Sequence, residues 1–309
     1  EGATKKDATF WRKIRPIPLT LEEVEEYKLK DSIKEKRNAK KYLDSIDQKN
    51  NTFRVSSFLS GYTYKNSYEK WVISLNPAST MISYNTVQGR NITANLNYFK
   101  RLNDKGNTIR TGIRINYGFT EKKMRPVFYF NKKWNHFEKP KMTLSVGITT
   151  SQFNEKNPIS SVQNSIYTLL FKENYLKIYE KTFGKISYTQ EIADGFHMSG
   201  SLEYADRVPL FNSTNNTIFK REIPFQSNNP RDPTNFSAPF TPHQMTSLNI
   251  DAMIIFGQKY ASYPNAKFSI ENPENPRVSM NYRKNFLATN REFHSDLLRM
   301  GIGQSASFE

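Results

Sequence analysis

Residues 108–119 read TIRTGIRINYGF, and this stretch decides the fold class. One face would carry its apolar residues Ile109, Ile113, Ile115, Tyr117 and Phe119, with Thr111 among them. The other face would carry Thr108, Arg110, Gly112, Arg114, Asn116 and Gly118. Alternation of this kind predicts a β-strand with one apolar and one polar face. The stretch is also about twice as long as an average strand of ~5–6 residues.

The same alternation recurs along most of the chain after residue 51. It is clear in residues 91–98, 142–149 and 196–204. Less regular stretches that we also predict to be strands are 71–75, 80–87, 125–134, 184–192, 246–256, 277–283 and 296–309. The pattern therefore predicts roughly ten to twelve antiparallel strands.

Strand length and the polar face together favour an outer-membrane protein over a soluble sandwich. A tilted transmembrane strand needs ~9–11 residues, which the clearest runs provide. Their polar face carries arginine and asparagine in mid-strand, where the core of a soluble sandwich would be apolar. Lipid on the apolar face and water on the polar face would explain both features. We therefore predict an all-β fold, an antiparallel transmembrane β-barrel of the outer-membrane type, over residues 51–309.

The predicted connections are unequal in length. Short turns are expected at 102–106, 135–140 and 193–195, and long loops at 151–182 and 207–245. Two strands separate the two long loops, so both loops leave the same end of the sheet and the short turns gather at the other. Outer-membrane barrels have this asymmetry, with long loops that face outward.

Residues 1–50 follow a helical pattern and contain almost no glycine. Thr20 and Glu23 have the spacing of a capping box, and Glu26 with Lys30 forms an i,i+4 pair in the favourable order. We predict a helix over about residues 21–47, broken in two, in a charged segment that lies in the periplasm.

Composition excludes several classes of protein. Only 37% of the 309 residues are apolar, against ~45–50% in typical globular chains, and no stretch has the ~18–20 consecutive apolar residues of a membrane helix. Aromatic residues make up 14% of the chain, which argues against disorder, and the chain has no cysteine. The net charge of +16 suggests an anionic partner such as nucleic acid, lipid phosphate or acidic glycan.

No nucleotide-binding or catalytic fingerprint is present, and the four histidines are not at metal-ligand spacing. Glu191, Glu203 and Asp251 fall on polar faces of strands, where a carboxylate group for general acid–base work is one reading. We favour ion pairs with lumen cations such as Arg110, Arg114, Arg283 or Arg299. We expect no enzyme, no cofactor and no metal. The candidate functional residues are the lumen-lining positions Arg110, Arg114, His197, Glu203, Asp251 and Arg283, which would bridge strands and give the lumen a slight preference for anions.

Aromatic and basic residues alternate in residues 128–134. A surface that stacks the bases of single-stranded nucleic acid would have this composition, and so would an aromatic girdle at a membrane interface. The position beside a turn favours the girdle, so we expect no nucleic acid among the partners. Expected partners are outer-membrane lipid, lipopolysaccharide, and other outer-membrane or periplasmic proteins.

Several stretches, taken in order, resemble one family. They include TVQG at 86–89, YTLLFKENY at 167–175, LEYADR at 202–207, PHQ at 242–244 and GQKYASYPN at 257–265. The set resembles a family of Bacteroidota outer-membrane proteins in which a carboxypeptidase-regulatory-like domain precedes a β-barrel of unknown function (domain of unknown function 5686). The resemblance covers residues 10–285 and lacks the regulatory-like domain, so the chain looks like the front part of the barrel region and we expect an incomplete barrel.

The resemblance implies an outer-membrane location and no enzyme. We therefore expect a non-enzymatic outer-membrane protein that acts in envelope assembly, in transport or in a larger barrel complex. Two alternatives stay open. One is a soluble basic β-protein that binds nucleic acid or acidic glycans, and the other is an envelope enzyme that acts on polysaccharide through lumen carboxylates.

Overall fold

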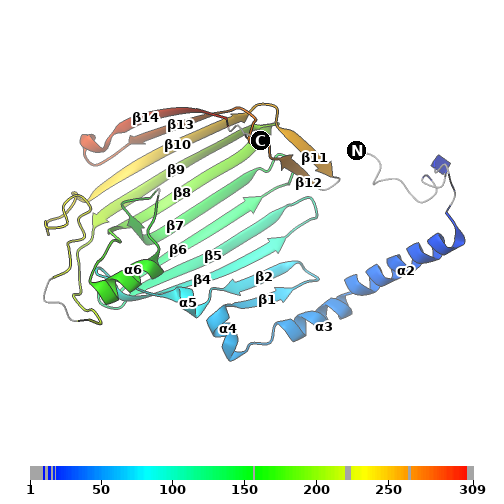
Figure 1. Ribbon diagram of the computed structural model, residues 1–309, viewed down its shortest axis with the longest axis horizontal. Coiled ribbons are helices and arrows are strands. Elements are labelled where there is room, and N and C mark those ends of the chain that lie inside the picture. Colours follow the sequence, from blue (N-terminus) through cyan, green and yellow to red (C-terminus); the bar gives the residue numbers. More distant parts are fainter. Residues whose placement is uncertain are drawn as a thin grey trace, which may run out of the picture.

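The structure, a computed structural model, describes residues 10, 13–14, 17, 19–155, 157–219, 224–263 and 266–304. It is mostly β: N-terminal helices precede a large antiparallel sheet of twelve strands (Figure 1). The predicted antiparallel β class is confirmed; the described residues contain fourteen strands, twelve of them in the large sheet, against the ten to twelve predicted. Residues 1–9 of the predicted helical segment and residues 305–309 of the predicted last strand lie outside the described residues.

The strands follow one another across the sheet in chain order. They are β1 (Tyr62–Asn66), β2 (Trp71–Leu75), β3 (Ile82–Asn85), β4 (Gly89–Arg101), β5 (Thr108–Gly118), β6 (Lys123–Lys133), β7 (Lys141–Gln152), β8 (Ile178–Ala193), β9 (Phe196–Pro209), β10 (His243–Ile255), β13 (Arg277–Phe286) and β14 (Ser295–Gly303). A separate hairpin, β11 (Lys259–Tyr263) and β12 (Ala266–Ile270), is inserted between β10 and β13.

Several boundaries differ from the sequence prediction. Strand β8 begins at Ile178, and β9 continues to Pro209, so the two long connections run over 153–177 and 210–242. The sequence prediction made both connections too long, because the alternating pattern is interrupted where charged residues enter the strands. Sequence reasoning also missed β1 and the hairpin of β11 and β12, which are only five residues each.

Strands β2 and β3 together occupy one strand position beside β4, with an interruption between them. Both pair with β4, and the short helix α5 (Ala78–Met81) separates them. The Asn76 side chain fills the break, because its Oδ1 accepts from the Asn95 amide at 2.7 Å and its Nδ2 donates to the Thr93 carbonyl at 3.2 Å.

Ladder register places apolar side chains in continuous rows on one face of the sheet. Phe130, Leu144, Ile186, Leu202 and Leu248 occupy one row from β6 to β10. Among the residues that the structure describes, no second layer covers this face, and Leu144, Ile186 and Leu202 are 37%, 45% and 43% exposed. The predicted alternation is therefore correct, and the apolar face is open to the surroundings.

The N-terminal helices lead to the edge of the sheet that β1 forms (Figure 1). Helix α2 (Leu21–Asn38) begins with the predicted Thr20–Glu23 capping box and contains the predicted Lys30–Glu26 ion pair at 2.6 Å. Helix α3 (Lys40–Asn50) follows, so the predicted break falls at Ala39, and α4 (Val55–Ser60) leads into β1. In the described part of the chain, no helix combines the length and the apolar character that a membrane crossing requires.

Side chains of α3 and the turns fix the end of the sheet that carries the short turns. Asp47 of α3 is buried and accepts from the Ser67 amide at 2.5 Å and from the Ser67 hydroxyl at 2.8 Å. Ser67 lies in the turn between β1 and β2, and Lys70 of that turn pairs with Asp104 of the next turn at 3.0 Å. The helical segment and the short turns therefore share one end of the sheet.

The opposite end is closed by a cap built largely from polar side chains. It contains α6 (Ser161–Ile166), the π-helical turn η2 (Tyr167–Phe171) and the 210–242 connection (Figure 1). Thr86 and Asn164 are fully buried. Asn174 joins them, because its Nδ2 donates to the Thr86 hydroxyl and its Oδ1 accepts from Asn164, both at 2.8 Å. A small apolar cluster of Val87, Leu176 and Ile178 lies beside this network.

The sheet is a path with two ends. All its ladders are antiparallel, the path runs from β1 to β14, and no ladder joins these two strands within the described residues. The path passes through eleven strand positions, with β3 beside it, so β1 and β14 point the same way.

Candidate binding cleft on the concave face

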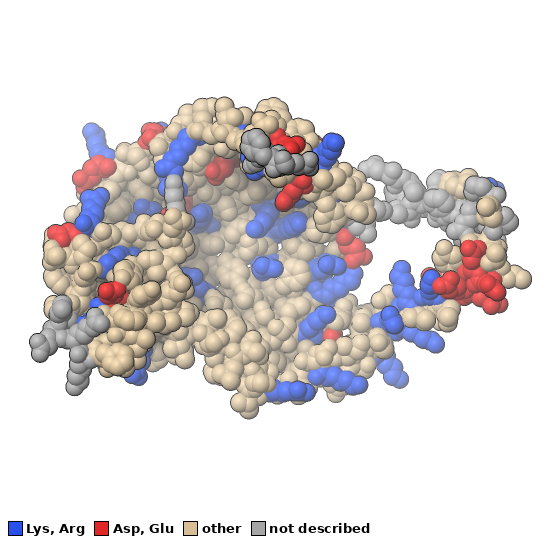
Figure 2. Space-filling model, in the orientation of Figure 1, with Lys and Arg blue, Asp and Glu red and all other residues tan. Residues whose placement is uncertain are grey.

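The polar face of the sheet is hollowed, and lysine and arginine side chains gather in the hollow (Figure 2). The six predicted residues lie on this face. Arg110 and Arg114 belong to β5, His197 and Glu203 to β9, Asp251 to β10 and Arg283 to β13. The sequence alternation placed them on this face correctly, but the structure brings only some of them together.

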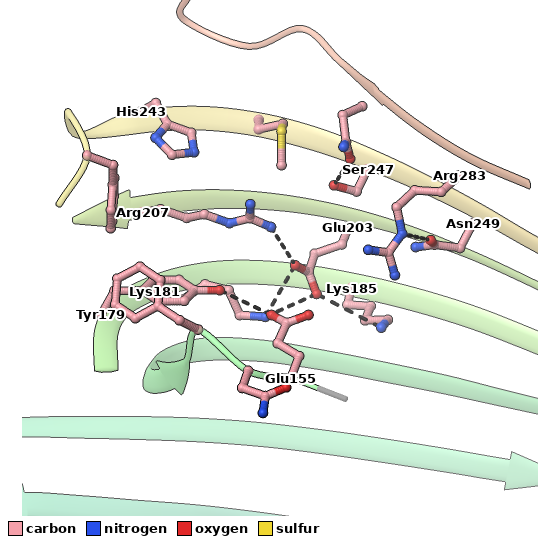
Figure 3. A pocket seen from close by; sticks show the side chains of 15 residues that line it. Glu155, Tyr179, Lys181, Lys185, Glu203, Arg207, His243, Ser247, Asn249 and Arg283 are labelled. Carbon is pink, nitrogen blue, oxygen red and sulfur yellow. Dashed lines mark hydrogen bonds and ion pairs between the residues drawn. The ribbon is translucent and has the colours of Figure 1, made fainter. Parts of the chain in front are cut away.

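A cleft of about 740 Å³ opens between the strands β8–β10 and β13 and the loop that follows β7 (Figure 3). Glu203 lies in the middle of it and is only 8% exposed. Lys181 Nζ lies 3.2 and 3.3 Å from the two Glu203 oxygens, Arg207 Nη2 lies at 3.8 Å and Lys185 Nζ at 4.0 Å. One carboxylate is thus shared by three cations, because a buried charge needs opposite charge close by.

Arg283 enters the same cleft from β13. Its Nε donates to Asn249 Oδ1 at 2.7 Å, and this is its one side-chain hydrogen bond among the described residues. The cleft is lined by four cations, Lys181, Lys185, Arg207 and Arg283, and by two carboxylates, Glu155 and Glu203. It therefore has a surplus of positive charge.

Aromatic rings form the end of the cleft nearest the long loops. Phe153, Tyr179 and Phe240 are mutual neighbours, with ring centroids 5.1 to 5.9 Å apart. His243 adds to the group, because its ring lies 5.4 Å from Phe240 and stacks on Phe293 at 3.8 Å. Figure 3 shows Tyr179 and His243 at one end of the cleft, and Lys185 and Arg283 at the other.

The remaining predicted residues lie elsewhere on the concave face. Arg114 lines a second hollow nearby and donates through Nη2 to the Thr149 hydroxyl at 2.6 Å. The Arg110 guanidinium lies 5.6 Å from the Phe99 ring. Asp251 accepts from Asn281 Nδ2 at 2.6 Å and from the Ser199 hydroxyl at 3.4 Å.

The sequence predicts ion pairs between these carboxylates and cations such as Arg110, Arg114, Arg283 or Arg299. Glu203 does pair with cations, but they are Lys181, Lys185 and Arg207 rather than the arginines named. Lys181 was missed because residues up to 182 were assigned to a loop. The alternation of Lys181, Phe183 and Lys185 on one strand face was the available signal.

The three carboxylates considered for catalysis are not grouped. Glu203 lies opposite Ser247 on β10, whereas Asp251 is four residues further along that strand, about 13 Å away. Glu191 lies at the turn end, where Lys139 Nζ is 3.0 Å from it and the Tyr260 hydroxyl bonds to it. His197 is opposite Glu191 on the neighbouring strand. No group of three or more potential metal-ligating side chains occurs among the residues that the structure describes.

The aromatic stretch on β6 is divided between the two faces. Phe128 is 48% exposed on the apolar face, whereas Tyr129 lines the second hollow on the concave face. The structure therefore places only part of this stretch on the apolar face.

The family model described as "Family of unknown function (DUF5686) C-terminal domain" matches residues 56–309. The chain belongs to this family. The match reaches residue 309, so the expectation that the resemblance ends near residue 285 is wrong. No curated protein and no solved structure matches the chain.

Proposed function

We propose that the chain is a non-enzymatic outer-membrane β-barrel protein that acts in envelope assembly, in transport or as part of a larger outer-membrane complex. Its apolar face would contact lipid and lipopolysaccharide, and its concave polar face would line a wet lumen. The N-terminal helical segment would lie in the periplasm, where other envelope proteins are the expected partners.

One observation carries the proposal: the polarity of the sheet is inverted relative to a water-soluble protein. Leu202 and Tyr204 on the apolar face are 43% and 49% exposed, whereas Glu203 between them is buried. A bilayer favours this arrangement, because apolar side chains then meet hydrocarbon and charged ones meet water and counter-ions.

The ends of the sheet support the orientation. The helical segment attaches at the end with short turns, and the long connections cap the other end. In outer-membrane barrels the short turns are periplasmic, which would put residues 21–50 in the periplasm.

The proposal requires partners for the end strands. Unpaired backbone groups in hydrocarbon cost several kcal/mol each, so a spanning sheet must be closed. Direct pairing of β1 with β14 would be parallel, because the two strands point the same way. Closure by an additional strand or by a partner protein keeps every ladder antiparallel.

Heat-modifiability tests the proposal. The full chain is extracted from membranes with detergent and run in SDS with and without boiling. We expect faster migration of the unboiled sample, because a closed barrel resists SDS in the cold. A protein that is soluble without detergent and shows no shift would contradict the proposal and favour the soluble basic β-protein.

The enzyme alternative has its own test. If a lumen carboxylate hydrolyses polysaccharide, Glu203→Gln abolishes release of reducing sugar from envelope glycans while the fold is retained. We expect no such hydrolysis from the unaltered chain or from Glu203→Gln, because the Glu203 carboxylate is already engaged by Lys181, Lys185 and Arg207.

A further inference from the structure

We propose that the cleft around Glu203 binds an anionic saccharide, a sugar that carries a carboxylate or phosphate group. This inference rests on the proposed function for the setting of the cleft, since it names a ligand for the wet face of the sheet.

Hydrogen-bond donors outnumber acceptors in the cleft. The Arg283 guanidinium uses only its Nε within the described residues, and Lys185 is no closer than 4.0 Å to Glu203. The Nε of Arg207 is buried and has no hydrogen-bond partner among the described residues. A buried donor without an acceptor is costly, so an oxygen-rich ligand would satisfy a group that the chain leaves unpaired.

The charge of the donors favours an anionic ligand. Glu203 and Glu155 neutralise only part of the charge of the four cations. Guanidinium and ammonium groups form their strongest hydrogen bonds with carboxylate and phosphate oxygens. Asn249, Ser247 and Asn285 line the same wall and offer the neutral polar groups that sugar hydroxyls require.

The rings favour a saccharide over a small inorganic anion. Phe153, Tyr179 and Phe240 provide apolar surface directly beside the cations. His243 and Asn249 are six residues apart on β10, so the cleft extends about 20 Å along the strand. Such a length accommodates a short oligosaccharide, with a ring at the aromatic end and an anionic group near Arg207 and Arg283.

The test is direct binding of defined saccharides to the detergent-purified full chain, measured by calorimetry at low salt. The probe is tetragalacturonate, and maltotetraose is the neutral control of equal length. We expect binding of tetragalacturonate and none of maltotetraose. Equal binding of tetragalacturonate and maltotetraose would overturn the proposal, and so would a failure to bind both tetragalacturonate and the phosphorylated disaccharide used below.

Variants locate the site. In the double variant Lys185→Gln with Arg283→Gln, we expect affinity to fall at least about tenfold, as for the loss of a hydrogen bond to a charged group. The matched control is Arg101→Gln with Lys105→Gln, which removes the same charge at the turn end of the sheet. Equal losses in both double variants would mean non-specific attraction and would contradict the site.

Two further arms define the ligand. Phe240→Ala should weaken the binding of tetragalacturonate but leave unchanged the ability of inorganic phosphate to compete with it. An unchanged affinity for the sugar would mean that the site recognises only the anionic group. The deacylated, phosphorylated disaccharide of lipopolysaccharide tests the lipid-linked source. Tighter binding of it indicates a lipid-linked phosphosugar, and tighter binding of galacturonate indicates a soluble acidic glycan. An oligothymidylate that binds when neither sugar does would overturn the proposal in favour of nucleic acid.

The outcomes for the barrel and for the cleft are separate. A heat-modifiable protein that binds no acidic sugar would support the barrel and contradict the saccharide site. A protein that binds tetragalacturonate through Lys185 and Arg283 but shows no gel shift would support the saccharide site and contradict the barrel.

Discussion

The two faces of strand β9 differ in which side chains are exposed. On the convex face, Leu202 and Tyr204 are about half exposed, whereas on the concave face Glu203 and Ala205 are 8% and 1% exposed. In a water-soluble sheet the charged residue would take the exposed position. The difference shows that burial in this chain follows the curvature of the sheet and the packing of its loops rather than the polarity of the residues.

The largest expected effect comes from the buried side of this comparison. Glu203→Gln removes the buried carboxylate shared by Lys181, Lys185 and Arg207, and leaves partly buried cations without it. We expect a loss of about 3–5 kcal/mol in the free energy of unfolding. Guanidinium unfolding of the detergent-solubilised protein measures it.

Glu155→Gln is the matched control, because Glu155 lines the same cleft but is exposed and receives one hydrogen bond, from Tyr179. Its loss should stay below about 1 kcal/mol. If the two variants are equally stable, the three-cation cluster does not stabilise the fold.

The exposed side of the comparison is tested by Leu202→Arg. If lipid covers this face, a charge near the bilayer midplane costs about 2–4 kcal/mol. Ser201→Arg, one residue away on the concave face, is the control and should cost much less. The measurement is the temperature at which the fast-migrating gel form is lost. A Leu202→Arg protein that keeps this temperature would show that the convex face meets water.

A smaller effect is expected from charge reversal on the concave face. Arg110→Glu with Arg114→Glu should shift the ion selectivity of reconstituted protein from anions towards cations, because both residues lie on the polar face of β5. Lys28→Glu with Lys36→Glu on helix α2 changes the net charge equally, away from the sheet. Unchanged selectivity in the β5 double variant would mean that these arginines line no path.

The smallest expected effect concerns the polar cap, which is neither face of the sheet. Lys177 donates to the Ser227 carbonyl at 2.6 Å, and burial lowers its pKa from 10.5 to about 8. Between pH 8 and 10.5 the unfolded chain holds a proton that the folded chain has released, so stability should rise with pH in this window. Thermal unfolding at pH 7.5 and 9.5 measures this rise.

Lys177→Met is the comparison protein for the pH series. It should show a smaller rise over the same window, because the titrating amine is gone. An identical pH dependence in both proteins would assign the rise to other groups.

Much of the architecture could be predicted from local pattern. Alternation in residues 108–119 defined β5 and its two faces, and the Thr20–Glu23 spacing marked the start of α2, because both features depend on residues close in sequence. The six candidate residues share the polar face of the sheet for the same reason, because strand alternation is a local property. The sequence prediction placed the starts of β8 and β10 too late. These strands begin inside the capped end of the sheet, where the packing of the loops determines the strand boundary.

The sequence by itself determined the β class, the strand faces, the helical segment and the surplus of positive charge, all of which follow from periodicity and composition. Only the tertiary structure decided that Lys181 and Arg207 meet Glu203, that Arg283 faces Asn249, and that the long connections fold into a polar cap. These contacts join residues that are far apart in the chain, or that lie near strand ends which the sequence pattern does not reveal. Ladder register and sheet curvature determine them, and neither is encoded in any single stretch of residues.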